Sequence, residues 1–136
     1  MFVVVSYWVL QTYYIKHQKT MSYREQFIWN RSVDLAVKCY SLTTYFPDSE
    51  LYGLTSQIRR SSVSVASNIA EGYGRRTRNE YIRYLHIALG SLRELDTQLI
   101  IAQKVKLADS KLLTPVISDV EEMQKIMVAS LNKLKT

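Results

Sequence analysis

A run of leucine and alanine between residues 85 and 102 constrains the fold of this chain more than any other feature. Leu85, Ala88, Leu92, Leu95, Leu99 and Ala102 follow one another at intervals of three, four, three, four and three residues. This spacing places all six on one stripe of an α-helix, as at the core positions of helices that cross at a shallow angle. The helix is expected to start at Thr77, because Thr77 and Glu80 have the spacing of a capping box.

Apolar residues recur at helical intervals in three other segments. The first runs from about residue 23 to residue 45 and carries two apolar stripes, one of Trp29, Val33, Ala36 and Tyr40 and one of Ile28, Leu35 and Leu42. The second runs from about residue 49 to residue 73, with Asp48 or Ser49 as its N-cap. The last ends near Leu134. It begins near Ser110 or Pro115, because proline is tolerated only in a first turn or at a kink.

The connections between these segments are short, around residues 46–48, 74–76 and 106–109. Pro47 is expected to end the first segment, and Gly72 and Gly74 are expected to end the second through left-handed backbone angles. Short connections make sequential helices antiparallel neighbours. The expected fold is therefore an all-α, antiparallel, up-down-up-down four-helix bundle, and a chain of 136 residues suits one such domain.

The first twenty residues stand apart from this pattern. They open with an apolar run of about ten residues, which is too short for a bilayer span of roughly twenty. Lys16 and Lys19 follow that run, whereas a secretory signal places its basic residues first. We expect residues 1–20 to be an extension that is not native or is disordered, and residues 21–136 to form the bundle. The alternative is an apolar arm that docks on a neighbouring subunit. No membrane segment is expected, because the apolar run is too short. A cytoplasmic protein is expected, because the one cysteine, Cys39, cannot form an internal disulfide and nothing points to an oxidising compartment.

Positive charge is concentrated in one stretch of the sequence. The whole chain carries a net charge of +6, and residues 57–93 contribute +5, from seven arginines against Glu71 and Glu80. Because guanidinium groups form forked hydrogen bonds with phosphate, the stretch favours nucleic-acid binding. The candidate contacts are Arg59, Arg60, Arg75, Arg76, Arg78 and Arg83. The alternative is a solvated basic surface that keeps the protein in solution.

The sequence offers no motif for catalysis or metal binding that we recognise. A di-iron bundle needs Glu-x-x-His pairs, but the histidines are His17 and His86, and the residue three positions before His86 is Arg83. The acidic residues Glu94 and Asp96 flank a core leucine and are expected to be solvated charges. The segment that begins at Gly72 is too short for a phosphate-binding loop and lacks its Lys-Ser/Thr pair. We therefore expect a protein that is not an enzyme and that takes no metal or cofactor.

Four further residues are expected to have structural roles, namely Asn68, Glu71, Gly72 and Gly90. A buried amide without partners costs roughly 1–3 kcal/mol, so Asn68 needs hydrogen bonds. Asn68 and Glu71 either join two helices in this way or orient the arginines. Gly90 lies in the middle of a helix, where glycine costs about 1 kcal/mol relative to alanine, so a close helix contact is expected there.

Several motifs resemble a known protein family. They include Phe46-Pro47, Gln57-x-Arg59-Arg60, Asn68-Ile69-Ala70-Glu71-Gly72 and Gly90-Ser91-x-x-Glu94-Leu95. From Tyr23 to Leu134 the chain is similar to the four-helix bundle proteins encoded by intervening sequences of bacterial 23S rRNA genes. The resemblance implies a homopentamer around a central channel. It also implies similarity to the accessory variability proteins of diversity-generating retroelements, which bind nucleic acid and a reverse transcriptase.

Two functions are compatible with these observations. The first is a non-catalytic homo-oligomer, pentameric as the resemblance implies, that binds RNA or DNA through its arginine-rich surface without strong sequence specificity. The second is a scaffold for a protein partner such as a polymerase. In that case the arginines meet an acidic protein surface and do not contact nucleic acid.

Overall fold

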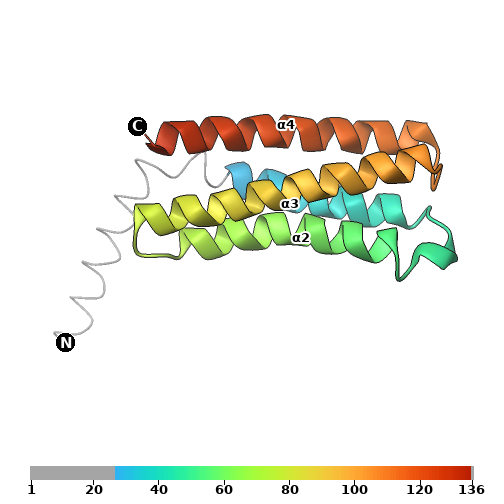
Figure 1. The fold of residues 1–136 in the computed structure, drawn as a ribbon, viewed down its shortest axis with the longest axis horizontal. Helices are drawn as coiled ribbons and strands as arrows, with labels where there is room; N and C mark the ends of the chain where they lie inside the picture. Colours follow the sequence, from blue (N-terminus) through green and yellow to red (C-terminus); the bar gives the residue numbers. More distant parts are fainter. Residues whose placement is uncertain (1–26, 136) are drawn as a thin grey trace.

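The computed structural model describes residues 27–135, and the chain is helical there apart from short connections (Figure 1). The first helix is described over residues 27–43 and is followed by a short 3-10 helix, η1 (Asp48–Glu50). Three long helices come next: α2 (Leu54–Tyr73), α3 (Arg78–Lys104) and α4 (Ser110–Lys135). The expected all-α bundle is confirmed. The extension predicted over residues 1–20 lies outside the described residues.

Side-chain contacts give the order of the four helices around the bundle. Arg59 on α2 donates a hydrogen bond of 2.9 Å to Thr43 at the end of the first helix. The side chains of Gln103 on α3 and Thr114 on α4 are joined at 3.2 Å. An ion pair of 2.6 Å between Lys38 and Asp119 connects the first helix with α4 and closes the ring. Each helix therefore contacts the next, and Figure 1 shows the α2–α3 turn and the end of α4 at the same end of the bundle.

The leucine and alanine repeat of α3 forms the centre of the core, as expected. All six of its residues are fully buried, with 0% exposure for Leu85, Ala88, Leu92, Leu95, Leu99 and Ala102. They belong to one cluster with the buried stripe of α4, which includes Leu113, Val120 and Met127. Burying each large side chain contributes about 1.5–3 kcal/mol to folding. The sequence repeat thus specifies the helix that packs against both α2 and α4.

The start of α2 differs from the expectation. The helix begins at Leu54 and not near residue 49, because Gly53, with φ −105° and ψ −121°, separates it from η1. Neither Asp48 nor Ser49 caps α2. The carboxylate of Glu50 instead accepts a hydrogen bond of 3.0 Å from the backbone N–H of Leu54. Leu51, which continues the apolar spacing of α2, lies in the intervening turn and is 48% exposed.

The two other connections are also closed by local hydrogen bonds. Gly74 ends α2 with φ −78°, and no glycine among residues 27–135 has a positive φ, so the left-handed stop expected at Gly72 and Gly74 was wrong. Thr77 accepts a bond of 3.2 Å from the backbone of Glu80, which confirms this half of the capping box. Asp109 caps α4 at Lys111 with a bond of 3.0 Å, so Pro115 lies inside the helix.

Candidate nucleic-acid interface

Gly72 sets how closely α2 and α3 approach each other. It is buried within α2, and a Cβ atom added to it would lie 2.5 Å from the Cβ of Tyr84 on α3. Real Cβ atoms do not come so close, so the position excludes every other residue unless the helices separate. Gly72 therefore allows a close approach of α3 and places Tyr84 beside the last turn of α2.

Tyr84 and Glu71 hold Arg75 in place at the start of the α2–α3 turn. The Nη2 atom of Arg75 donates to the Tyr84 hydroxyl at 2.7 Å and to Glu71 Oε1 at 3.0 Å. The guanidinium also lies 4.9 Å from the centre of the Tyr84 ring. The neighbouring Tyr84 and Glu71 raise the pKa of Arg75 above its ordinary value, and the group is charged at neutral pH in any case. Arg75 is therefore a positioning residue for the turn.

A chain of hydrogen bonds runs along the rest of the α2–α3 contact. Asn68 donates to the backbone oxygen of Ser64 at 2.8 Å and to the Ser64 hydroxyl at 3.0 Å. Ser64 in turn bonds Ser91 of α3 at 2.9 Å. One turn further along, the buried Ser61 donates to Gln98 at 3.0 Å. The geometry favours the structural role expected for Asn68, which lies within this chain of bonds and not against an arginine.

Gly90 makes no close contact within the chain. It is exposed on α3, and no atom lies within 4 Å of the position that its Cβ would take. The helix contact expected to explain this glycine is therefore absent from the part of the chain that the structure describes.

The two acidic residues that flank Leu95 lie in different surroundings. Glu94 is exposed and accepts a hydrogen bond of 3.2 Å from Gln98, in agreement with a solvated charge. Asp96 is half-buried, and its Oδ1 atom is enclosed without a hydrogen-bond partner among residues 27–135, so full solvation was the wrong expectation for this carboxylate.

The six arginines proposed as nucleic-acid contacts do not form one surface. Arg59 is half-buried and engaged, because it bonds Thr43 and its guanidinium lies 4.8 Å from the centre of the Tyr40 ring. Arg60 is exposed on the outside of α2. Sixteen residues of mostly helical chain separate Arg60 from Arg76, which is about 24 Å at 1.5 Å per residue. Arg59 and Arg60 are thus remote from the other four.

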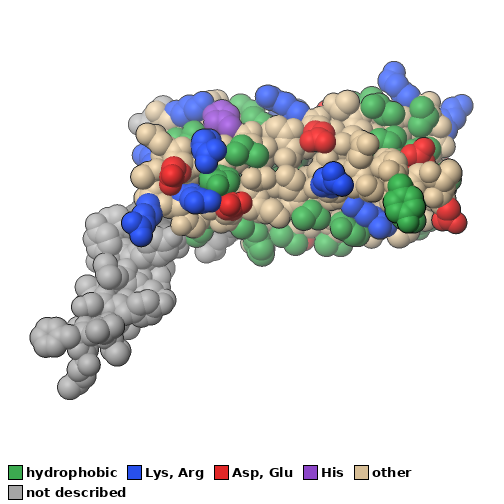
Figure 2. Space-filling view, turned by 60° about the horizontal axis from the view of Figure 1, so that its bottom comes forward, with side chains coloured by type: hydrophobic (Ala, Val, Ile, Leu, Met, Phe, Trp, Pro, Cys, Tyr) green, Lys and Arg blue, Asp and Glu red, His purple; other side chains and the backbone are tan. Residues whose placement is uncertain are grey.

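Three of the predicted arginines come together at the α2–α3 turn, and we call Arg76, Arg78 and Arg83 the turn cluster. All three are exposed. Within residues 27–135, no hydrogen bond or ion pair engages Arg76 or Arg78, and Arg83 lies 4.9 Å above the Tyr84 ring. Figure 2 shows Lys and Arg side chains gathered at this end of the molecule, among a few acidic ones.

Two further cations at this end were missed by reasoning from the sequence. Lys133 and Lys135 lie in the last turn of α4, which Figure 1 places at the same end as the α2–α3 turn. The antiparallel order of four helices of similar length brings these two places together, so the predicted topology itself contained this information.

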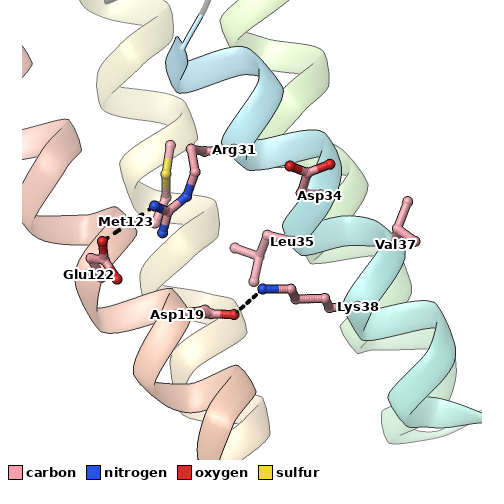
Figure 3. A pocket seen from close by; sticks show the side chains of 8 residues that line it. All are labelled: Arg31, Asp34, Leu35, Val37, Lys38, Asp119, Glu122 and Met123. Carbon is pink, nitrogen blue, oxygen red and sulfur yellow. Dashed lines mark hydrogen bonds and ion pairs between the residues drawn. The ribbon is translucent and has the colours of Figure 1, made fainter.

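A groove of about 430 Å³ between the first helix and α4 also carries charge, but of both signs (Figure 3). Arg31 pairs with Glu122 at 3.3 Å, and Lys38 pairs with Asp119 at 2.6 Å, so both cations of the groove face carboxylates. Asp34 adds a further negative charge to its lining. The groove is therefore a poor site for phosphate, in contrast to the turn cluster.

Neither a metal-binding cluster nor a helix able to span a membrane occurs in the described range. No group of three or more His, Cys, Asp or Glu side chains placed to hold a metal ion was found between residues 27 and 135. Among the helices described there, none is both long and apolar enough to cross a membrane.

Comparison with known proteins places the chain in a family. No curated protein matches it. One similar solved structure is a protein with unknown function from the S23 ribosomal protein family of Bacteroides thetaiotaomicron. It has 22% sequence identity and a TM-score of 0.73 over 83% of this chain and 99% of that one, a likeness that shows the fold. The family model of the 23S rRNA-intervening sequence protein matches residues 24–129, and the chain therefore belongs to the 23S rRNA-intervening sequence protein family.

Proposed function

We propose that this protein is a non-catalytic homo-oligomer, pentameric as the family resemblance implies, that binds RNA or DNA through the turn cluster at one end of each bundle. Arg60 supplies a further contact on the outside of α2. Arg59 and Arg75 act indirectly, since their guanidinium groups are already engaged by protein side chains.

The observation that carries the proposal is the difference between paired and unpaired cations. Arg31 and Lys38 face carboxylates, and Arg59 and Arg75 are bonded to protein groups. Arg76 and Arg78 are exposed and, within residues 27–135, have no such partner, so their donors are available to an anion. The charge-assisted bonds that guanidinium forms with phosphate are among the strongest polar contacts in proteins.

The same geometry supports binding without strong sequence specificity. Contacts to phosphate position a protein on nucleic acid, whereas contacts to base edges carry the sequence information. The cations of the turn cluster lie at the end of a helix bundle, and assembly would repeat the cluster in every subunit. Repeated weak contacts raise the overall affinity without any new contact. The name of the family refers to ribosomal RNA, which makes RNA the first nucleic acid to test.

The test compares two double variants that each remove two positive charges. Arg76→Ala/Arg78→Ala removes cations from the turn cluster, and Lys104→Ala/Lys111→Ala removes exposed cations from the opposite end of the bundle. With a labelled single-stranded RNA at moderate salt, we expect the first variant to bind about tenfold or more weakly, which corresponds to about 1.4 kcal/mol. The second variant should bind like the unmodified protein. Equal losses of RNA affinity in both variants would mean that binding depends on net charge and not on the turn cluster. If the unmodified protein does not bind RNA, the protein-interaction scaffold is favoured.

A further inference from the structure

The first helix has two apolar stripes, and the core covers only one of them. Ile28, Leu35, Cys39 and Leu42 are at most 4% exposed and form its inner stripe. The other stripe consists of Trp29, Val33, Ala36 and Tyr40. Trp29 is 42% exposed and Tyr40 is 45% exposed, and the neighbouring Val37 reaches 60%. A helix that is apolar on two sides normally packs against something on both.

The second stripe, in which Val33 and Ala36 are half-buried, continues onto α2. Val63, Ala66 and Ala70 follow Arg59 on α2 at intervals of four, three and four residues, the same spacing as in the stripe of the first helix. The stacking of Arg59 on Tyr40 shows that the two stripes lie side by side. We call Trp29, Val33, Ala36, Tyr40, Val63, Ala66 and Ala70 the outer apolar face. Figure 2, which turns the α2 side forward, shows hydrophobic side chains along its lower edge.

The charge distribution argues against nucleic acid as the occupant of this face. None of its seven residues is charged. Arg59, at its border, is engaged by Thr43 and Tyr40. A chain with a net charge of +6 repels other copies of itself, and this repulsion is weakest where two uncharged faces meet. The face is therefore suited to self-association, which leaves the cations at the α2–α3 turn exposed.

The two stripes differ in the size of their side chains. The stripe of the first helix ends in two large side chains, Trp29 and Tyr40, whereas the stripe of α2 has the small Ala66 and Ala70. Aromatic side chains that fill space above small residues are typical of the buried centre of an interface. The aromatic stripe of the first helix and the small-residue stripe of α2 are different surfaces. One copy can therefore place its aromatic stripe on the small-residue stripe of the next copy. Such head-to-tail contacts form a closed ring when the rotation between copies allows it.

We propose that the outer apolar face is where a second copy of this chain docks, with Trp29 and Tyr40 of one copy packed over Ala66 and Ala70 of the next. This inference rests on the homo-oligomer in the proposed function and adds the surface that forms it. The face lies within residues 24–129, which the family model matches.

The test uses the full chain and two variants that each place one carboxylate on an exposed valine. Val63→Glu changes the outer apolar face, and Val128→Glu changes a residue of similar exposure on α4, with 42% and 38% exposure in the unmodified protein. Both proteins should keep the helical circular dichroism of the unmodified protein, and the loss of the assembly should lower the thermal midpoint of Val63→Glu alone. By native mass spectrometry, Val63→Glu should fall to the single-chain mass of 15.8 kDa, whereas Val128→Glu should keep the mass of the assembly.

Each other outcome overturns a different statement. If Val63→Glu keeps the mass of the assembly, the outer apolar face is not the surface between copies, although the protein is still a homo-oligomer. If the unmodified protein itself has the mass of one chain, the homo-oligomer fails and the face fails with it. A photo-crosslinking residue at position 63 identifies the occupant: a covalent product of two chains supports the proposal. A product within one chain that joins position 63 to residues 1–20 would assign the face to that segment and overturn it.

Discussion

Two glycines with opposite surroundings show how much of this fold is decided by single residues. Gly72 is buried, and a Cβ there would lie 2.5 Å from the Cβ of Tyr84. Gly90 is exposed, and nothing lies within 4 Å of the place where its Cβ would be. Both lie inside helices, where glycine is intrinsically unfavourable. Only Gly72 is explained by packing within one chain.

Substitution by alanine should therefore change stability in opposite directions at the two positions. We expect Gly72→Ala to lower the free energy of unfolding by about 1–3 kcal/mol, because the added methyl group forces α2 and α3 apart. Gly90→Ala should raise it by about 0.5–1 kcal/mol, since alanine is the better helix former. Urea denaturation followed by circular dichroism measures both. A destabilised Gly90→Ala protein would show that a neighbour packs on Gly90.

Cys39 gives a pH-dependent prediction. Its side chain is fully buried, and burial raises the pKa of the thiol from 9.0 to about 12. The unfolded chain loses the thiol proton near pH 9, whereas the folded chain keeps it to higher pH. The stability that comes from burying the neutral thiol is therefore complete below pH 9 and is lost as the pH rises from 9 toward 12.

Between pH 9 and pH 11, we expect the free energy of unfolding of the unmodified protein to fall more steeply than that of Cys39→Ala. The difference in slope should be about 1.4 kcal/mol per pH unit. Urea titrations at several pH values measure it, and subtracting the variant removes the titration of lysine and tyrosine. Parallel curves for the two proteins would mean that the thiol ionises as easily in the folded chain as in the unfolded one.

At the scale of residues, the sequence predicted which side chains carry charge. It did not predict which of them are free of protein partners and can contact an anion. Arg75 and Arg76 are adjacent and look equivalent, yet Arg75 is bonded to Tyr84, nine residues away. Arg59 and Arg60 differ in the same way, because Thr43 and Tyr40 lie on another helix. Such pairings depend on how two helices come together, and local spacing does not contain that information.

At the scale of elements, the buried face of a helix can be predicted when the helix has a single apolar stripe. α3 has one continuous stripe of leucine and alanine, and all six predicted positions are fully buried. The first helix has two stripes, so spacing alone could not decide which one faces the core. α2 begins later than expected because Leu51 keeps the apolar spacing although Gly53 has already interrupted the helix.

Two substitutions in α3 test this account of the element. Leu92→Ala, at a position with 0% exposure, should lower the free energy of unfolding by about 2–5 kcal/mol, because it leaves a cavity at the centre of the bundle. Ile101→Ala, on the same helix but 44% exposed, should change it by about 0.5 kcal/mol or less. Chemical denaturation gives both values. Similar losses at both positions would contradict the assignment of the buried stripe.

At the scale of the whole molecule, the chain separates three kinds of surface. The groove between the first helix and α4 pairs its charges, and the outer apolar face has none. The α2–α3 turn presents Arg76 and Arg78, which have no partner among residues 27–135. The turn cluster therefore combines exposed arginines at one end of the bundle. The sequence predicted the basic stretch, and the predicted antiparallel topology already implies that the end of α4 lies at the same end of the bundle.

The dependence of RNA affinity on salt tests the central claim, that free guanidinium groups of the turn cluster contact phosphates. Each neutralised phosphate of a single strand contributes about −0.7 to the slope of log K against log salt. We predict a slope of about −2 or steeper for the unmodified protein, since Arg76, Arg78 and Arg83 are exposed together. Arg76→Ala/Arg78→Ala should reduce its magnitude by about 1.4. An affinity that does not change with salt, or a slope that the variant leaves unaltered, would contradict the claim.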